Sequence, residues 1–399
     1  MSDVLITYGW VRSSYNALRN LSKHGISVSV SDTSRVGMSQ FSKFKSNINI
    51  YTSHYKNENQ FIKDILRICS ENNIKLILPS HNETEIFARN KDLFKGMLPV
   101  LFPDEAHCKI FNNKSSSYDF VEDLGIPTPK RIKYKNTDNL YKILKKEDCN
   151  HTVIKLLTGN SSKGVFYANS PLKAQKIVKN LIKEYKLDIN RLPQVEERIE
   201  GEGYGCSVLY WKGEYITHFT HKRLREKILT GGTSTYREAS INKNIEIATK
   251  KIFDSIGYNG LAMCEFKVCK KTGKFWFIEV NPRMWGSISL PIQAGTEFPY
   301  LAWLCATEGP EAAKQYDQER IKDNTWRAKW LLGEAFLLIT LLRELKFKEI
   351  YKIFTEKKPN SIDDFFWDDP LVLLGEIFAY LKSTILNRST NPSEKGMIG

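Results

Sequence analysis

The sequence predicts a mixed α/β and α+β protein, with a parallel α/β layer, a two-lobed region rich in strands and a helical C-terminal extension. Three observations predict this class. Short apolar runs alternate with helical patterns over residues 1–105. Residues 106–318 contain mostly strand-like segments separated by glycine-containing turns. Residues 319–399 contain two strongly apolar helical stretches, over 331–342 and 371–381, and a polar tail that we expect to be disordered from Asn387.

The first 105 residues predict a Rossmann-like domain. Helical patterns alternate with strand-like runs at residues 4–8, 26–30 and 75–79. Ligands bind beyond the C-terminal ends of such strands, which directs attention to residues 9–14 and 80–85. Arg12 and Ser14 stand at the start of the first predicted helix, where they could hold a substrate anion. A plain helix cap is the alternative interpretation.

Residues 106–193 and 194–318 form the two predicted lobes. Helical residues 106–126 stop at the GIPTP segment, as expected where proline follows a helix. Residues 225–240 are rich in Gly, Ser and Thr and predict a long ordered loop. The remaining elements are expected at 152–168, 171–187, 194–205, 206–211, 214–220, 243–256, 261–269 and 274–280.

The last two of these strands predict a hairpin around residues 271–273. Uninterrupted pairing about this loop places Glu265 opposite Glu279, with Asn281 on the same face. Two facing carboxylates repel each other unless a cation lies between them, and oxygen ligands favour Mg²⁺ or Mn²⁺. Arg283 follows two residues later and could reach phosphate oxygens. The alternative, a solvated hairpin, is disfavoured by the apolar neighbours on both strands.

Two lysines and a polar loop predict an anion site. Lys155 lies inside an apolar strand-like run, and the loop TGNSSKG (158–164) follows it. Gly164 permits a tight turn, and Ser161 and Ser162 add hydroxyl donors, so backbone N–H groups here can surround an anion. The loop is not a Walker motif, because no GK[ST] precedes a helix. A plain hairpin turn, and for Lys114 a surface lysine, are the alternatives.

The segment PQVEERIEGEGYG (193–205) predicts a strand that ends in a glycine-rich turn. Extended backbone around Glu196 and Glu197 can hydrogen-bond a flat adenine edge. An acid in the turn, for which we select Glu202, could accept hydrogen bonds from ribose hydroxyls. For each residue alone, a solvated charge is the alternative.

The overall composition limits the classes of partner that we expect. A formal net charge of +14 favours anionic ones, such as nucleotides, acidic sugars or an anionic membrane surface. No secretion signal and no run of 18 apolar residues is visible, so we expect a cytoplasmic protein without a transmembrane helix. Seven cysteines without a CxxC pair fit reduced thiols rather than zinc. No nucleic-acid-binding motif is present, so nucleic acid is not an expected partner.

Taken in this order, the segments resemble the ATP-grasp superfamily, and most closely its carbamoyl-phosphate-synthase-like carboxylate–amine ligases. The resemblance runs from Val4 to about residue 310, and its most specific part is LAMCEFKVCKKTGKFWFIEVNPRMWGS. It implies a pre-ATP-grasp domain over 1–105 and the two ATP-grasp lobes over 106–193 and 194–318. It also implies ATP and Mg²⁺ (or Mn²⁺) as cofactors.

The resemblance assigns roles to individual residues. The implied ATP ligands are Lys114, Lys155, Ser161, Ser162, Gly164, Glu196, Glu197, Ile199 and Glu202. The implied metal ligands are Glu265, Glu279 and Asn281. The implied catalytic residues are Arg283, Lys155 and Arg223. The implied substrate residues on the acceptor side are His221, Gly231, Gly232, Thr233 and Ser234. In the D-alanine ligase branch an arginine precedes the first metal acid by two residues, and Met263 stands there in this sequence.

The resemblance implies a ligase that forms an amide through an acyl-phosphate and releases ADP and phosphate. The expected substrates are a small carboxylate and an amine, such as an amino acid, a small peptide or an acidic sugar. A bicarbonate or phosphate acceptor, a basic nucleic-acid-binding protein and a degenerate ATP-sensing protein are the alternatives. The C-terminal helices either pack on the core or form a homodimer face, or else they contact a membrane peripherally. Each apolar run holds a glutamate (Glu334, Glu376), which argues against spanning.

Overall fold

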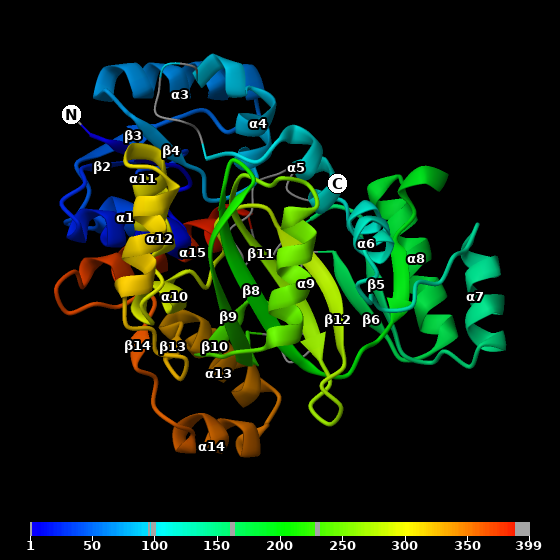
Figure 1. Cartoon of the computed structure of the whole chain (residues 1–399). Helices are drawn as coiled ribbons and strands as arrows, with labels where there is room; N and C mark the ends of the chain where they lie inside the picture. The colour runs from blue at the N-terminus through cyan, green and yellow to red at the C-terminus, as the bar shows by residue number, and fades with distance from the viewer. Residues whose placement is uncertain (1, 95, 97–100, 160–163, 228–231, 388–399) are drawn as a thin grey trace.

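The computed structural model describes residues 2–94, 96, 101–159, 164–227 and 232–387, which form three sheets with flanking helices (Figure 1). The expectations for Ser161, Ser162, Gly231 and the tail beyond residue 387 lie outside the described residues. The mixed α/β and α+β class is confirmed. The boundaries between the predicted domains stay predictions.

The N-terminal sheet has the strand order β3-β2-β1-β4 and is parallel throughout. Its strands are β1 (Val4–Ile6), β2 (Val28–Asp32), β3 (Asn47–Ile50) and β4 (Leu76–Leu78). Its helices are α1 (Arg12–Lys23), α2 (Met38–Phe41), α3 (Glu58–Asn72), α4 (Glu83–Arg89) and the 3-10 helix η1 (Lys91–Phe94). The alternation of strand and helix predicted this layer. The edge strand β3 was missed, because its sequence NINI is half polar.

A small antiparallel sheet, ordered β6-β5-β7, forms the separate lobe on the right of Figure 1. It consists of β5 (Thr152–Lys155), β6 (Val165–Ala168) and β7 (Gln194–Glu197). The helices of this lobe are α7 (Thr137–Lys146), α8 (Pro171–Tyr185) and the 3-10 helix η2 (Ile189–Arg191), whereas the preceding helices α5 (Glu105–Asn112) and α6 (Lys114–Asp123) pack against the central sheet. Apolar side chains of α7 and α8 cover one face of this sheet, and Leu140, Leu144 and Val178 are fully buried.

The central sheet has the order β12-β11-β8-β9-β10-β13-β14. Its strands are β8 (Glu202–Trp211), β9 (Glu214–Glu226), β10 (Ser234–Ala239), β11 (Gly260–Val268), β12 (Phe275–Asn281), β13 (Arg327–Lys329) and β14 (Ser361–Ile362). The associated helices are α9 (Lys243–Asp254), α10 (Ser289–Gln293), α11 (Phe298–Thr307) and α12 (Pro310–Glu319).

The prediction of a loop over 225–240 was wrong. Strand β9 continues to Glu226, and β10 pairs with both β9 and β13. The polar composition of β10 suggested a loop, but its central residue Arg237 is fully buried because its guanidinium pairs with Asp363. That partner lies more than a hundred residues further along the chain, where sequence pattern could not connect the two.

The β11–β12 hairpin has the predicted central pair. Glu265 lies opposite Glu279, and Met263 lies opposite Asn281. Between Glu265 and Phe266 the register shifts by one residue, so the expected uninterrupted pairing is interrupted by a bulge. Gly273 adopts a φ of +69° in the turn, a conformation that favours glycine.

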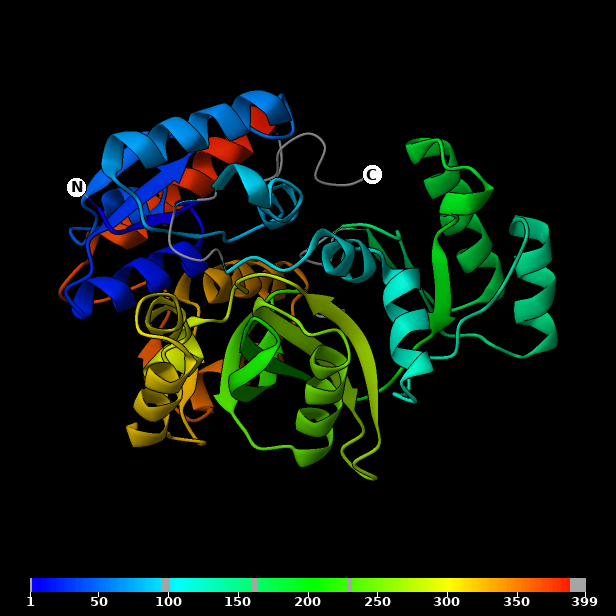
Figure 2. The same ribbon diagram turned by 45° about the horizontal axis from the view of Figure 1, so that its top comes forward.

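The C-terminal extension forms α13 (Leu331–Arg343), α14 (Phe347–Thr355) and α15 (Leu371–Asn387) and returns to the N-terminal domain. Helix α15, drawn in red, lies beside the blue N-terminal elements in Figure 2, and its Val372 is fully buried in the core that they share. Among the described residues, no helix is both long enough and apolar enough to cross a bilayer. Packing on the core is therefore the interpretation that α15 supports.

This packing changes the expectation for Arg12 and Ser14. Arg12 forms a 2.9 Å ion pair with Asp363, and its guanidinium lies 3.7 Å above the Trp330 ring. The Ser14 hydroxyl donates to backbone carbonyls, that of Thr7 at 2.9 Å among them. Both side chains hold parts of the fold together, so the structure gives no support to their proposed contact with a substrate anion.

Candidate functional site

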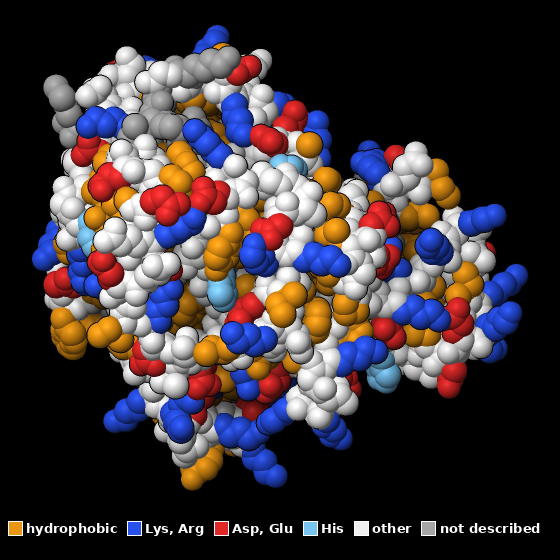
Figure 3. All heavy atoms as spheres, viewed as in Figure 1, with side chains coloured by type: hydrophobic (Ala, Val, Ile, Leu, Met, Phe, Trp, Pro, Cys, Tyr) orange, Lys and Arg blue, Asp and Glu red, His pale blue; other side chains and the backbone are white. Residues whose placement is uncertain are grey.

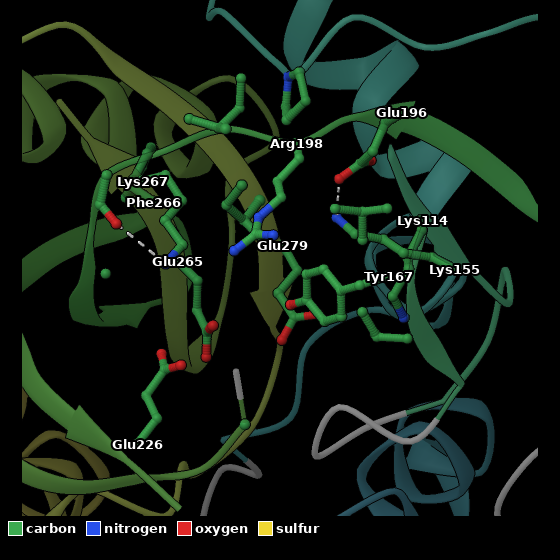
Figure 4. A pocket seen from close by; sticks show the side chains of 18 of the residues that line it. Lys114, Lys155, Tyr167, Glu196, Arg198, Glu226, Glu265, Phe266, Lys267 and Glu279 are labelled. Atoms are coloured by element: carbon green, nitrogen blue, oxygen red, sulfur yellow. Dashed lines mark hydrogen bonds and ion pairs between the residues drawn. The ribbon is translucent and has the colours of Figure 1, made fainter. Parts of the chain in front are cut away.

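A cavity of about 390 Å³ lies between the small sheet and the central sheet (Figure 4). The small sheet contributes Val153 and Lys155 from β5, and the central sheet contributes Glu265 and Glu279. The segment from Glu196 to Gly201 joins the two sheets and lines the cavity between them. The cavity therefore lies at a junction between lobes, a common location for ligand sites.

Both predicted lysines lie in this cavity. Lys114 begins helix α6, is 6% exposed, and donates a 3.1 Å hydrogen bond from Nζ to the carbonyl of Gly159. Burial lowers the pKa of Lys114, and the carboxylate of Glu279 opposes that shift. Lys155, 5% exposed, forms a 2.5 Å ion pair with Glu196 and a 3.0 Å hydrogen bond to the Tyr118 hydroxyl. Two buried ammonium groups thus face one cavity, as an anionic ligand would require.

Of the predicted anion-binding loop over residues 158–164, the structure describes Thr158, Gly159 and Gly164. Gly164 has a φ of +81°, and a Cβ there would lie 3.0 Å from the Leu156 side chain. Both features require glycine at this position. The Leu156 N–H donates to the Gly164 carbonyl at 2.9 Å, which closes the turn between β5 and β6.

The predicted adenine-binding segment around Glu196, Glu197 and Ile199, which we call the hinge, contains side chains that point in different directions. Glu196 is buried, accepts from Gln194 at 2.8 Å and lines the cavity with Ile199. Glu197 does not line it, and its carboxylate accepts a 3.0 Å hydrogen bond from the backbone N–H of Lys130. The alternation along a strand explains this difference, because successive side chains point to opposite faces.

The selection of Glu202 as the ribose acid receives no support from the structure. Glu202 is the first residue of β8 and pairs with Lys222 at 2.9 Å, away from the cavity lining. The acid that lines the cavity is Glu200, beside Gly201. Sequence spacing alone could not distinguish two glutamates separated by one glycine.

The two hairpin carboxylates lie at the inner end of the cavity. The Glu265 carboxylate is bonded by the Arg223 guanidinium and accepts from the Asn281 amide at 3.4 Å. Burial raises the pKa of Glu265 despite Arg223. Arg223 also lies 3.5 Å from Glu226, and in Figure 4 the Glu226 and Glu265 carboxylates point toward each other. Glu226 is an acid that the sequence analysis missed.

The donor set at this position fits a hard divalent cation. Glu265 and Glu279 offer carboxylate oxygens from directly paired strand positions, and Asn281 would contribute its amide oxygen, which in this structure accepts from Arg283. Across the described residues, no group of three or more His, Cys, Asp or Glu side chains could hold a metal ion. A cation here would therefore rest on two carboxylates and an amide, with its remaining ligands coming from water or a bound anion.

Arg283 lines a second cavity of about 240 Å³ that adjoins the first through Lys114, Gly159 and Glu279. Its guanidinium donates to the Asn281 side-chain oxygen and to the Met284 carbonyl, both at 3.0 Å. Burial lowers the pKa of Arg283, and Glu279 opposes that shift.

The far wall of this second cavity comes from the N-terminal domain. It includes Asn82 and Glu85, which belong to the predicted ligand-facing segment 80–85. The Glu85 carboxylate accepts from the Asn112 amide at 2.7 Å. The wall therefore carries both hydrogen-bond donors and hydrogen-bond acceptors.

The predicted acceptor segment lines a third cavity of about 120 Å³ with Gly232, Thr233 and Ser234. Arg223, Glu265, Glu279, Asn281 and Arg283 line it as well, so the acceptor segment and the carboxylate pair do meet. His221 does not line it. This side chain is 1% exposed and packs against Gly205, where a Cβ would lie 2.4 Å from the ring. Burial lowers the pKa of His221 well below its usual value, which makes it a neutral core residue.

Sequence reasoning missed several cavity residues besides Glu200 and Glu226. The Arg198 guanidinium lies 5.6 Å from the centre of the Tyr167 ring, and both side chains line the 390 Å³ cavity. Lys267 lines it too, with Nζ 3.3 Å from the Gly201 carbonyl. Strand alternation with Glu265 would have marked Lys267, whereas Tyr167 stands on β6 without any distinguishing pattern.

Comparison with known proteins identifies one domain of the chain. A family model described as an ATP-grasp domain matches residues 111–287. Acetyl-CoA carboxylase 2 of Oryza sativa subsp. japonica is 28% identical over 91 residues, which are 23% of this chain and 4% of the carboxylase. The chain therefore matches only a small part of that relative.

Solved structures share the fold at low sequence identity. The biotin carboxylase of Campylobacter jejuni, in complex with β-γ-ATP, has a TM-score of 0.63 and 14% identity, covering 77% of this chain and 71% of that one. The biotin carboxylase domain dimer of Hydrogenobacter thermophilus 2-oxoglutarate carboxylase, with MgADP, ADP and bicarbonate, has a TM-score of 0.60 and 16% identity, covering 82% and 71%. An N5-carboxyaminoimidazole ribonucleotide synthetase with ADP has a TM-score of 0.60 and 13% identity, covering 82% and 80%.

Proposed function

We propose that the chain, which contains an ATP-grasp domain over residues 111–287, is an ATP-dependent carboxylate–amine ligase of the ATP-grasp superfamily. One observation carries the proposal. The facing acids Glu265 and Glu279 line both the 390 Å³ cavity, which holds two buried lysines, and the 120 Å³ cavity that Arg283 also lines. This arrangement provides a place for a polyphosphate and a place for the group that receives its terminal phosphoryl.

We propose that ATP occupies the 390 Å³ cavity. The apolar side chains of Val153 and Ile199 line the part nearest the hinge, where extended backbone can bind adenine. Lys114 and Lys155 face the phosphates, and Glu200 stands where ribose hydroxyls would lie. Buried ammonium groups interact strongly with phosphate because little water screens them.

Glu265, Glu279 and Asn281 would hold Mg²⁺ or Mn²⁺, which when bound neutralises phosphate oxygens and aligns the terminal phosphoryl for transfer. Arg223 bonds Glu265 and so fixes the direction in which that carboxylate presents its second oxygen. Arg283 is held by Asn281 and the Met284 carbonyl, and its charge offsets that of the transferred phosphoryl group.

The proposed reaction has two steps. A substrate carboxylate oxygen attacks the γ-phosphorus, the bond to the β–γ bridging oxygen breaks, and ADP leaves. An amine then attacks the acyl carbon, phosphate leaves with the electron pair of the carbon–oxygen bond, and the amine proton passes to solvent. The protein contributes by positioning the reactants and by balancing charge.

The 240 Å³ cavity is the proposed site of the small substrates. Its walls pair Arg283 and Lys114 on one side with Glu85 on the other. A molecule with both a carboxylate and an ammonium group matches these charges, so an amino acid or a small peptide fits better than an acidic sugar without an amine.

A carboxylase that uses bicarbonate as its acid is the second candidate. The proteins that this chain resembles favour it, since they include an acetyl-CoA carboxylase, biotin carboxylases and a carboxyaminoimidazole ribonucleotide synthetase. The same cavities would then hold the smaller bicarbonate ion.

Omission assays separate the two candidates. The protein is incubated with MgATP and the proteinogenic amino acids, or with MgATP and bicarbonate alone, and nucleotides and phosphate are quantified. We expect ADP and phosphate to form in equal amounts only when amino acids are present. ADP formation that depends on bicarbonate and ignores amino acids would favour the carboxylase, and AMP with pyrophosphate would refute both.

A further inference from the structure

Helix α14 has two apolar faces, and only one of them is covered. Ile353 packs against Leu337 and Leu341 of α13. The opposite face carries three aromatic side chains that are 63%, 69% and 74% exposed, namely Phe347, Tyr351 and Phe354. Spacings of four and three residues put these rings in one stripe along the helix. A helix that only stabilised the core would place polar side chains on this outer face.

The apolar surface continues into the turn between α13 and α14. Leu342 is 54% exposed and Leu345 is 71% exposed. We define the α14 tip as these two leucines together with Phe347, Tyr351 and Phe354. In Figure 1, α14 lies at the lower extremity of the molecule, away from the N-terminal domain. Apolar side chains gathered at a protruding end mark an interaction surface.

Basic side chains surround the α14 tip. Six exposed cations lie within residues 342–358, the segment that contains the tip: Arg343, Lys346, Lys348, Lys352, Lys357 and Lys358. Of the acids in the same segment, Glu344 pairs with Lys346, Glu349 pairs with Lys352, and Glu356 turns inward to Arg225. The outward charge is therefore positive, and Figure 3 shows blue side chains around an orange one at this lower end.

We propose that the α14 tip docks on the surface of an anionic lipid bilayer. Aromatic and leucine side chains would enter the boundary between headgroups and acyl chains, while the lysines would contact anionic headgroups. The contact would be peripheral, because none of the described helices is long and apolar enough to span. This inference is independent of the proposed reaction.

Charge disfavours a second copy of the chain as the occupant of this surface. A two-fold contact brings the same patch of both copies together, so the six cations of one tip would face those of the other. Like charges across an interface cost several kilocalories per mole. An anionic bilayer offers the complementary charge together with an apolar layer.

The α14 tip is also connected to strand β9, which contributes to the cavities. Arg225 of β9 donates from Nε to Glu334 Oε1 of α13 at 3.0 Å. It also donates to the carboxylate of Glu356, the residue after α14, at 2.7 Å. Arg223, two residues earlier on β9, lines the cavities. Docking would therefore hold the cavities at a defined distance from the bilayer.

Vesicle co-sedimentation of the full chain tests the proposal. We expect binding to phosphatidylcholine vesicles that contain phosphatidylserine and little binding to pure phosphatidylcholine, with affinity falling as salt rises. Replacement of all three α14 rings by serine should weaken binding at least tenfold. Lys348→Gln and Lys352→Gln should each weaken it about fivefold at low salt.

Matched variants provide the controls. Leu172, Ile189 and Ile247 are 65–66% exposed and lie away from α14, so their replacement by serine should leave vesicle binding unchanged. Circular dichroism confirms that the α14 variant is folded. Failure of the wild-type chain to bind anionic vesicles, or equal losses in both triple variants, would overturn the proposal. Concentration-dependent dimerisation that the α14 variant abolishes would overturn it as well, by identifying a second copy as the occupant.

Discussion

Replacement of Lys155 by methionine tests whether the cavity is built on a buried ion pair. Lys155 and Glu196 are 5% and 2% exposed, and their charged groups lie 2.5 Å apart. Methionine keeps most of the side-chain volume but leaves the Glu196 carboxylate buried without its cation. The Tyr118 hydroxyl also loses a partner, since Lys155 lies 3.0 Å from it.

Removal of one member of a buried pair costs about 3–5 kcal/mol, because the remaining charge has neither water nor a counter-ion. We therefore expect Lys155→Met to lower the free energy of unfolding by about that amount. Glu196→Gln should have a similar effect. The double variant removes both charges, so it should be less destabilised than the sum of the single variants, by about 2 kcal/mol or more.

Urea unfolding followed by circular dichroism measures these free energies without any nucleotide. Lys75→Met is the matched control, because Lys75 and Asp3 form a 2.8 Å pair at the surface with side chains 51% and 32% exposed. Loss of an exposed pair costs about 1 kcal/mol or less. If Lys155→Met were no more destabilising than Lys75→Met, the buried-pair reasoning would be refuted.

Three further predictions follow from the site and from the N-terminal domain. Glu279→Gln should lower kcat by about a hundredfold or more while preserving the far-UV spectrum, because a ligand of the proposed cation is lost; a rate near wild type would contradict the metal assignment. Glu200→Gln should raise the KM for ATP severalfold, whereas Glu202→Gln, whose side chain pairs with Lys222 outside the cavity, should not. Burial lowers the pKa of His54 to about 4 from its usual 6.5, so the unfolded chain takes up this proton first as pH falls. Stability should therefore decrease between about pH 6.5 and pH 4, by about 3 kcal/mol from this group, and His54→Phe should reduce that loss in urea unfolding at different pH values.

The β11–β12 hairpin shows how much of the site the sequence could predict. Residue spacing around a glycine turn was enough to place Glu265 opposite Glu279, because pairing in a hairpin is local. Lys155 was also identifiable, since an ammonium group inside an apolar run requires an anionic partner, whereas Lys114 in its polar segment was marked only by the family resemblance. The bulge after Glu265 was not predicted, because nothing in the local composition marks it.

Contacts between distant segments account for the residues whose predicted roles the structure does not support. Arg12 was expected to hold a substrate, but its partner Asp363 lies at the other end of the chain. The same carboxylate neutralises Arg237 and allows a polar segment to form the interior strand β10. Glu200 and Glu202 differ only in which side of the strand start they occupy, and that depends on the pairing of Glu202 with Val268 of β11.

Transfer of oxygen from substrate to phosphate tests the central claim most directly. The protein is incubated with MgATP and amino acids whose carboxylates carry ¹⁸O, and the released phosphate is analysed by mass spectrometry. An acyl-phosphate intermediate predicts one ¹⁸O atom in each phosphate formed, together with ADP. Phosphate without ¹⁸O, or label found in AMP, would contradict attack of the carboxylate on the γ-phosphorus.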